Sequence, residues 1–345
     1  MPHLSPSRRL SLAAGLAAAA LLLGGCASSA AQDPAAKPAA GTGFPVTIDS
    51  KLGSATITSR PKRVVTVSWT NQDVAAALGV VPVDMPFASY GDNNKDGILP
   101  WTYDALKKLK GTDVPLHDET DGIPFEAIGD AQPDVILAAY SGLTQEDFDT
   151  LSKIAPVVGY PDKPWGTSWK ETTLMDAKAL GKEKEAKAKI ASTEKLMAAE
   201  VAKYPKIAGK TFAYLSITSA NPDAITYYTP NDARVQFVTE LGLKNSPTVE
   251  KLSKGSSEFY GTISAENADT IDADIVILYA DSDEALDAIA QNPLLGQIPA
   301  VKRGAVVPMI DTTFIMSTSA PSLLSIPWAL DKYVPLIGKA AAKAD

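Results

Sequence analysis

The sequence predicts an α/β protein with two similar lobes, mainly because one helix–strand unit occurs twice. The first copy, FEAIGDAQPDVIL, begins at residue 125 and places Glu126 eight residues before Asp134. The second copy, AENADTIDADIVIL, begins at residue 265 and places Glu266 eight residues before Asp274. Each aspartate opens a nearly continuous apolar run, which is typical of a strand covered on both faces. A single repetition indicates two lobes and not a many-copy array.

Strands alternate with helical segments in both halves of the chain, which predicts mostly parallel, doubly wound sheets. The expected strands cover residues 64–69, 80–85, 135–140 and 156–160 in the first lobe, and 211–217, 224–229, 274–280 and 305–310 in the second. In such sheets the ligand crevice lies beyond the carboxyl ends of the strands.

The first 25 residues are typical of a secretory signal. Arg8 and Arg9 precede a 14-residue apolar run, which is too short to span a bilayer, and Leu-Gly-Gly then leads to Cys26. The small residues before Cys26 resemble the lipobox of bacterial lipoproteins, in which the cysteine becomes the lipidated N-terminus. The alternative is an ordinary signal peptide with an unrelated cysteine. Cys26 is the single cysteine of the chain, so an intramolecular disulfide is excluded.

The remaining chain is divided by composition into a tether, two lobes and a connector. Residues 26–43 are rich in Ala, Ser, Pro and Gly and are expected to form a flexible tether. Ser168 with Glu171 forms a capping box and Gly181 follows, so residues 168–181 are expected to form a helix of roughly 20 Å that connects the lobes. The lobes then cover residues 44–167 and 182–345. Within the second lobe we expect the helical region 319–337 to be broken, because it contains Pro321, Pro327 and Pro335.

Aromatic residues gather where the expected strands reach their carboxyl ends. One such residue alone is compatible with packing, but several at one edge of a sheet indicate a ligand site. The candidate ligand-binding aromatics are Trp69, Tyr90, Trp101, Tyr140, Trp165, Tyr228 and Tyr260.

Arg234 is the arginine expected to face this crevice. It lies in the first turn of a helix expected over residues 232–241, whereas Arg60 and Arg63 precede a strand and Arg303 lies in a turn. The alternative places Arg234 on the solvated face of its helix.

The chain offers little for catalysis, metal binding or nucleic-acid binding. His117 is the single histidine after the signal and is expected at the surface, and no nucleophile elbow, Walker loop or dinucleotide fingerprint occurs. One histidine cannot supply the usual zinc or manganese ligands. Residues 92–97 match the opening of a calcium loop, but Tyr103 stands where the bidentate glutamate belongs, which favours a polar turn over calcium. A formal net charge of −8 without a basic cluster argues against nucleic acid. We therefore expect no catalytic residue, resident metal or cofactor.

Several motifs in this order resemble the periplasmic binding proteins that deliver iron–siderophore complexes and vitamin B12 to ABC importers. The resemblance implies two Rossmann-like lobes of the class III type, joined by one rigid helix, with the ligand held between them and little hinge closure. The motifs are RPKRVV at 60–65, ALGV at 77–80, the stretch 125–137, IAPVV at 154–158, ISAE at 263–266, NPL at 292–294 and AVKRG at 300–304.

The resemblance implies a monomeric lipoprotein that captures a ferric siderophore, with hydroxamate or mixed hydroxamate ligands expected, and delivers it to an ABC permease. In that family an acidic residue in each lobe, here Glu126 and Glu266, pairs with arginines on the two permease subunits. A simpler account is that each carboxylate complements its helix dipole. A haem or corrinoid receptor of the same fold, an extracytoplasmic enzyme, and a sensor or adhesion protein are the alternatives.

Overall fold

A computed structural model describes residues 43–218 and 223–344. The expected signal, Cys26 and nearly all of the tether lie outside these residues. The described residues belong to one compact unit, 39–345. Among them we find no helix that is both long and apolar enough to cross a membrane.

The N-terminal half is built on a parallel sheet with strand order β3-β6-β7. Its apolar strands pack on both faces: Val64 and Leu137 face one cluster, while Val65 and Ile136 face another. The elements of this half are β1 (Val46–Asp49), β2 (Ser54–Ile57), β3 (Val64–Thr66), α1 (Asn71–Ala77), β4 (Met85–Pro86), α2 (Pro100–Leu109), β5 (Leu116–His117), α3 (Phe125–Asp130), β6 (Val135–Leu137), α4 (Gln145–Leu151) and β7 (Val157–Val158).

The C-terminal half is built on a six-stranded sheet with strand order β11-β9-β8-β12-β13, with β10 pairing with β8. β9 and β11 are antiparallel to their neighbours because β8 and β9 are joined by too few residues for a helical crossover. The elements of this half are η1 (Pro205–Ile207), β8 (Thr211–Ser216), β9 (Ala224–Tyr228), α7 (Ala233–Glu240), β10 (Lys244–Asn245), α8 (Pro247–Ser253), β11 (Tyr260–Ser264), η2 (Ala265–Thr270), β12 (Ile275–Tyr279), α9 (Asp283–Gln291), η3 (Leu295–Gln297), α10 (Pro299–Lys302), β13 (Val306–Met309), α11 (Thr312–Ser319) and α12 (Ser325–Lys343).

The repeated aspartates have a common structural role at the amino edges of the two sheets. The Asp134 carboxylate accepts hydrogen bonds from the backbone N–H groups of Lys62 (2.7 Å) and Arg63 (3.0 Å). The Asp274 carboxylate accepts hydrogen bonds from the N–H (2.8 Å) and hydroxyl (3.0 Å) of Thr211. Each aspartate therefore ties the start of its own strand to the start of the neighbouring strand, which explains the repeat without reference to a ligand.

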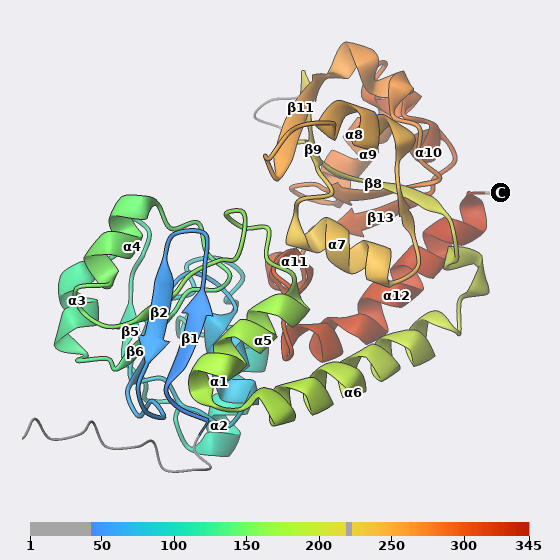
Figure 1. Ribbon diagram of the computed structural model, residues 1–345. Helices are drawn as coiled ribbons and strands as arrows, with labels where there is room; N and C mark the ends of the chain where they lie inside the picture. Colours follow the sequence, from blue (N-terminus) through green and yellow to red (C-terminus); the bar gives the residue numbers. More distant parts are fainter. Residues whose placement is uncertain (1–42, 219–222, 345) are drawn as a thin grey trace, which may run out of the picture. The chain divides into compact units, whose positions relative to one another are not determined.

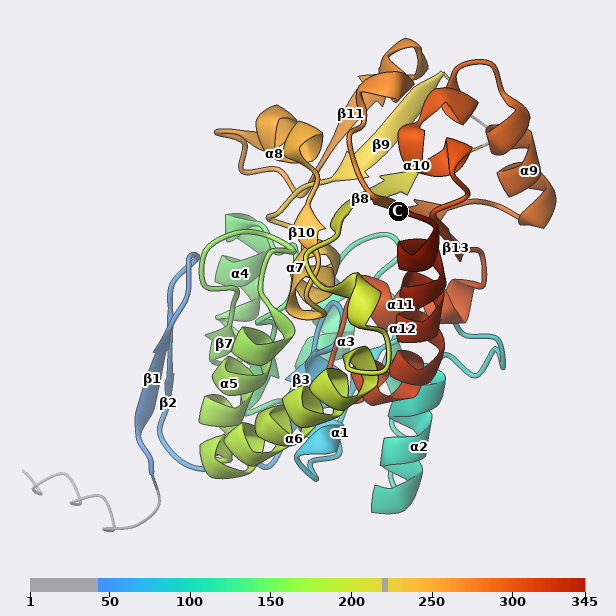
Figure 2. The same cartoon turned by 90° about the vertical axis from the view of Figure 1, so that its right-hand side faces the viewer.

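The connection between the halves is shared by two adjacent helices, α5 (Trp169–Leu180) and α6 (Glu183–Val201), as Figures 1 and 2 show. α5 begins with Trp169 in the C-terminal core and ends with Leu180 in the N-terminal core. α6 then begins with Ala186 in the N-terminal core and reaches Met197 in the C-terminal core. The expected connector helix is confirmed as an element, but α6 carries the chain onward between the halves and is buried along one face.

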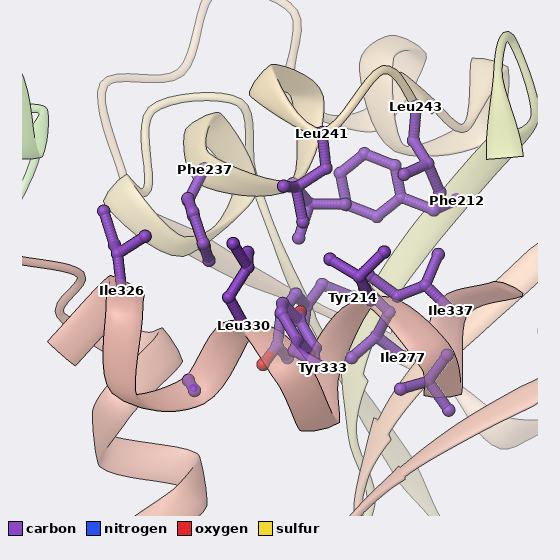
Figure 3. Packing of buried hydrophobic residues seen from close by; sticks show 14 of the residues in the cluster. Phe212, Tyr214, Phe237, Leu241, Leu243, Ile277, Ile326, Leu330, Tyr333 and Ile337 are labelled. Carbon is purple, nitrogen blue, oxygen red and sulfur yellow. The ribbon is translucent and has the colours of Figure 1, made fainter. Parts of the chain in front are cut away.

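The C-terminal helices break once, around Pro321. The expectation that the region 319–337 is broken is therefore confirmed, although Pro327 and Pro335 both lie inside α12. Pro327 falls in the first turn, where backbone N–H groups have no intrahelical partner. Around Pro335 the helix is held by its apolar face: Tyr333 and Ile337 are fully buried in the cluster of Figure 3, against β8, β12 and α7.

The chain between α11 and α12 also packs on the N-terminal half. The buried Asp73 carboxylate accepts hydrogen bonds from Ser322 Oγ (2.6 Å), Trp101 Nε1 (2.8 Å) and Thr102 Oγ1 (2.5 Å). The rings of Trp101 and Trp328 lie 5.3 Å apart. Burial raises the pKa of Asp73, while the three hydrogen bonds act to lower it. Asp73 thus joins α1, α2 and the C-terminal segment.

Candidate ligand-binding site

A pocket of about 540 Å³ lies at the carboxyl ends of the strands and takes residues from both halves of the chain. A second pocket of about 350 Å³ adjoins it, with Trp69 lining both. The first pocket is lined by Trp69, Tyr90, Ser216, Ile217, Thr218, Tyr228, Arg234, Tyr279, Ala280, Asp281, Ile310, Thr312, Ile315, Met316 and Ser319.

Exposed aromatic rings form the N-terminal wall. Trp69 is 42% exposed and Tyr90 is 47% exposed, both far more than is usual for large aromatic residues in a folded protein. The Trp69 ring lies 5.4 Å from that of Trp165, which lines the second pocket. Trp165 adopts a φ of 58°, and a side chain at Gly142 would collide with its indole. The N-terminal wall of the pocket therefore consists of flat aromatic rings, and the backbone at Trp165 and Gly142 leaves room for one of them.

Arg234 lies at the C-terminal side of the pocket, held by an acid and by tyrosines. Asp232 caps α7, and its Oδ1 accepts hydrogen bonds from both the backbone N–H and Nε of Arg234, each at 2.8 Å. The guanidinium Cζ lies 3.9 Å from the centre of the Tyr228 ring, and Nη1 lies 3.3 Å from the hydroxyl of Tyr279. The tyrosine rings fix the guanidinium over a π face, a favourable arrangement for a cation.

The charged residues that line the two pockets are one arginine, Arg234, and three acids, so the lining carries no excess of positive charge. Burial raises the pKa of Asp232, and the Arg234 charge acts to lower it. Asp281 lines the first pocket, and Glu119 and Asp147 line the second. Burial also raises the pKa of Tyr228, so its phenol stays neutral at physiological pH.

The structure brings together four of the eight residues predicted to bind ligand: Trp69, Tyr90, Tyr228 and Arg234 all line the first pocket. Trp165 lines the second pocket.

The other three predicted residues lie elsewhere. Trp101 is buried with its indole N–H bonded to Asp73, although it lines a small cavity next to Trp69. Tyr140 is buried behind Trp165, with ring centres 5.6 Å apart. Tyr260 is exposed on β11 and lines neither of the two pockets around Trp69.

Sequence reasoning missed Tyr279, Phe87 and Ser319. Tyr279 ends β12, the strand of the second repeated unit, so its place at the carboxyl edge could have been found. Its hydroxyl is hydrogen-bonded to the hydroxyl of Ser319. Phe87 lines the second pocket and follows directly after a two-residue strand that is too short to recognise in the sequence.

The prediction that His117 lies at the surface is wrong. Its side chain is buried, with Nδ1 3.1 Å from Asp84 Oδ2 and Nε2 3.0 Å from Glu119 Oε1. The polar residues that follow it in the sequence suggested a solvated loop, but Asp84 is brought to it by the pairing of β4 with β5.

No group of metal-ligating side chains is found within residues 43–218 and 223–344. The Asp92 carboxylate accepts hydrogen bonds from the N–H groups of Asn94 (2.9 Å) and Gly97 (2.7 Å), so the calcium-like segment closes on itself as a polar turn.

The two glutamates of the repeated units are exposed and line neither pocket around Trp69. Glu126 lies in the first turn of α3 and Glu266 in the first turn of η2.

Comparison with known proteins identifies the family of the chain. The periplasmic binding protein family matches residues 64–311. The chain belongs to this family. This confirms the resemblance that the motifs of the sequence indicated, and with it the class III architecture.

Individual members of the family include iron-binding proteins of several kinds. The chain is 28% identical to the Fe(3+)-citrate-binding protein YfmC of Bacillus subtilis, over 84% of this chain and 85% of that protein. It is also 28% identical to the ferric enterobactin-binding periplasmic protein FepB of Escherichia coli O6:H1, over 85% of this chain and 90% of that protein. The crystal structure of Streptococcus pneumoniae TIGR4 PiaA in complex with ferrichrome is similar, with a TM-score of 0.82 and 42% identity over 87% of this chain and 99% of that one.

Proposed function

We propose that the protein is the substrate-binding lipoprotein of an ABC importer and that it captures a ferric hydroxamate siderophore in the pocket between Trp69 and Arg234. The observation that carries this proposal is the pairing of exposed flat rings with a single arginine that is already neutralised by Asp232.

The aromatic wall suits a bulky chelate that brings its own iron. Flat rings offer large apolar contact area at low conformational cost, and the hydroxyls of Ser216, Thr312 and Ser319 supply hydrogen-bonding groups around the pocket.

The charge balance favours hydroxamate over the other common chelates. A ferric trihydroxamate is electrically neutral, whereas a ferric tricatecholate is a trianion. Arg234 already pairs with Asp232, and His117 with Glu119, so a trianion would meet no unpaired positive charge among these residues and would be repelled by the carboxylates that line the two pockets. The ferrichrome complex of the 42% identical protein supports the same class.

Tryptophan fluorescence tests the proposal, because Trp69 and Trp165 lie in the pocket walls and should be quenched by bound iron chelate. The titration compares a ferric trihydroxamate with a ferric tricatecholate, ferric citrate, haem and cobalamin. We expect saturable quenching at the lowest concentration with the trihydroxamate. If the tricatecholate binds more tightly than the trihydroxamate, the charge argument is contradicted. If haem or cobalamin binds more tightly than either, the ligand is not a siderophore but a tetrapyrrole or corrinoid.

We expect the protein to be anchored by acyl chains on Cys26, because the small residues before it follow the lipobox pattern. Cells grown with radioactive palmitate should label the protein, and Cys26→Ala should abolish the label. A label of unchanged intensity in that variant would contradict the anchor.

We expect Glu126 and Glu266 to dock the loaded protein on its permease. Each is exposed near the amino end of a short helix, one glutamate in each half of the chain. The double substitution Glu126→Ala with Glu266→Ala should leave siderophore affinity and melting temperature nearly unchanged, while siderophore uptake by cells should fall at least tenfold, roughly the loss of one charge-assisted hydrogen bond.

A matched control is Glu146→Ala with Glu284→Ala, which also removes one exposed first-turn glutamate from each half, in α4 and α9. This control should transport normally. Equal uptake by both double variants, at matched expression, would show that Glu126 and Glu266 serve only their helices.

A further inference from the structure

A buried cluster of charged side chains lies behind the aromatic wall. His117 is 4% exposed, and its two ring nitrogens face two different carboxylates, Asp84 at 3.1 Å and Glu119 at 3.0 Å. Asp84 comes just before β4, and Glu119 follows β5 and lines the pocket of about 350 Å³. The imidazole therefore connects the sheet to a residue of the ligand site.

Glu119 in turn holds the backbone that carries Trp69. Both of its carboxylate oxygens accept a hydrogen bond from the N–H of Ser68, each at 3.0 Å. Ser68 has a φ of 60° and Thr70 a φ of 67°, so Trp69 stands between two residues in the left-handed region. Non-glycine residues adopt that region at a cost and keep it only where their surroundings impose it. Glu119 holds this backbone at Ser68, together with Asn71, whose Nδ2 donates hydrogen bonds to the carbonyls of Val67 (2.8 Å) and Trp69 (3.1 Å).

His117 also supports Phe87, a further exposed aromatic residue, which lines the second pocket. Its backbone carbonyl accepts a hydrogen bond of 2.7 Å from the N–H of Phe87, and Phe87 lines the same pocket as Trp69. One residue thus supports two aromatic groups of the wall, through its side chain for Trp69 and through its backbone for Phe87.

We propose that His117 and Glu119 are positioning residues of the ligand site, which hold Trp69 against the chelate, so that siderophore affinity depends on the protonation of His117. This inference rests on the proposed function for its ligand, but not for its mechanism. The protonated imidazole fixes Glu119 by charge-assisted hydrogen bonding, and Glu119 fixes the Ser68 amide. A neutral imidazole keeps one N–H but loses its charge, so its hydrogen bond to Glu119 becomes weaker, and with it the hold of Glu119 on the loop that carries Trp69.

The charged groups that face His117 set the pH at which its imidazole loses its proton. Burial acts to lower the pKa of His117, but the neighbouring carboxylates of Asp84 and Glu119 outweigh burial and raise the pKa to about 9 from its ordinary value of 6.5. The neighbouring Asp118 is exposed and bonds Thr120, and the charge of His117 contributes to the lowering of its pKa. Because this pKa is that of the folded protein, His117 is protonated well below pH 9, and its charged support of Glu119 is lost as the pH rises through 9. The pKa values of Tyr90 and Tyr228 are raised above 10, so these phenols stay neutral over the same range.

The first experiment uses the ligand-free protein, so its result does not depend on which chelate binds. Selective ¹⁵N-serine labelling gives the amide proton shift of Ser68, which a carboxylate acceptor moves downfield. We expect this shift to titrate with a midpoint near pH 9 in the wild type and to lose that titration in His117→Gln. A Ser68 amide that does not titrate between pH 6 and 10 would overturn the inference.

The second experiment measures the dissociation constant of a ferric trihydroxamate between pH 6 and 9.5. The wild type should weaken as the pH approaches 9, whereas His117→Gln should bind more weakly at pH 7 with a flat profile. Glu119→Gln should weaken binding roughly tenfold at pH 7, the effect of losing one hydrogen bond to a charged group.

Asp118→Asn is the matched control, because it removes a carboxylate next to His117 that does not hold the Trp69 loop. It should keep the wild-type pH profile. The same profile in His117→Gln as in the wild type would overturn the inference, while absence of chelate binding in every protein, with the Ser68 titration intact, would contradict the proposed function alone.

Discussion

Replacing Arg234 with alanine should weaken the binding of a ferric siderophore by tenfold or more. A hydrogen bond to a charged group contributes roughly 1.5–3 kcal/mol, which corresponds to about ten- to a hundredfold in affinity. The guanidinium Cζ lies 3.9 Å from the centre of the Tyr228 ring, and Arg234 lines the larger pocket. There a chelate oxygen can accept hydrogen bonds from the N–H groups of Arg234 that have no other partner named above. Arg234→Lys should recover little of the affinity, because an ammonium group lacks the planar fork that spans Asp232, Tyr279 and a ligand.

The same substitution should also affect stability, in a way that depends on pH. Without Arg234, the buried Asp232 loses the charge that lowers its pKa, so this pKa rises further above 3.8. An acid whose folded pKa lies above its unfolded pKa favours unfolding as the pH rises through that range. The melting temperature of Arg234→Ala should therefore fall more at pH 7 than at pH 4, which calorimetry at both pH values would measure.

Arg303→Ala is a matched control on the same half of the chain. Arg303 donates hydrogen bonds to the carbonyls of Ala273 (3.0 Å) and Asp274 (3.2 Å), at the amino edge of the sheet. It should lower the melting temperature without changing siderophore affinity. Equal affinities for wild type and Arg234→Ala would remove Arg234 from the ligand site.

Asp73→Ala should produce the largest loss of stability, about 3 kcal/mol or more in the free energy of unfolding. The substitution leaves three buried donors, on Trp101, Thr102 and Ser322, without their acceptor. Each unsatisfied buried polar group costs about 1–3 kcal/mol, and part of that cost is avoided if water enters the space. Urea unfolding followed by tryptophan fluorescence would measure the change.

Asp104→Ala provides the control for this stability effect, because Asp104 is an exposed carboxylate on the same helix, α2, as Trp101. Its free energy of unfolding should stay within about 0.5 kcal/mol of the wild type. A similar small change in Asp73→Ala would show that the hydrogen bonds to Ser322 and Trp101 do not hold the C-terminal segment on the N-terminal half.

The fold could be predicted from the sequence where the signal was local. The apolar runs after Asp134 and Asp274 gave two buried strands, and Ser168 with Gly181 gave both ends of α5. The continuity of α12 through Pro335 could not be predicted, since it depends on burial against strands far away in the chain. The antiparallel direction of β9 could have been predicted, because the two expected strands are separated by only residues 218–223, too few for a helical crossover.

The sequence predicted the location of the candidate site more reliably than the individual residues that form it. The rule that ligands bind beyond the carboxyl ends of strands placed Trp69, Tyr228 and Arg234 together. The same rule cannot distinguish a ring that faces the pocket from one such as Trp101, whose indole N–H is taken by Asp73. The burial of His117 escaped prediction for the same reason, because its partner Asp84 is near only in the folded chain.

The packing of the C-terminal segment on the N-terminal half has a consequence for the order in which the chain can fold. Three residues of the N-terminal half contact partners near the C-terminus. The Trp101 ring packs on Trp328, and the Asp73 carboxylate accepts a hydrogen bond from Ser322. The carbonyl of Gly91 accepts one of 2.6 Å from the hydroxyl of Thr313. A chain synthesised from its amino end supplies these partners last. The cores on the two faces of β3, β6 and β7 are complete by residue 186, whereas the part of the N-terminal half around α2 gains its last partners, Met316, Leu324 and Trp328, only when almost the entire chain has been made. Until then the surface of α2 that α12 will cover stays open to water and to other proteins, so this surface is the part of the N-terminal half whose burial depends on completion of the chain.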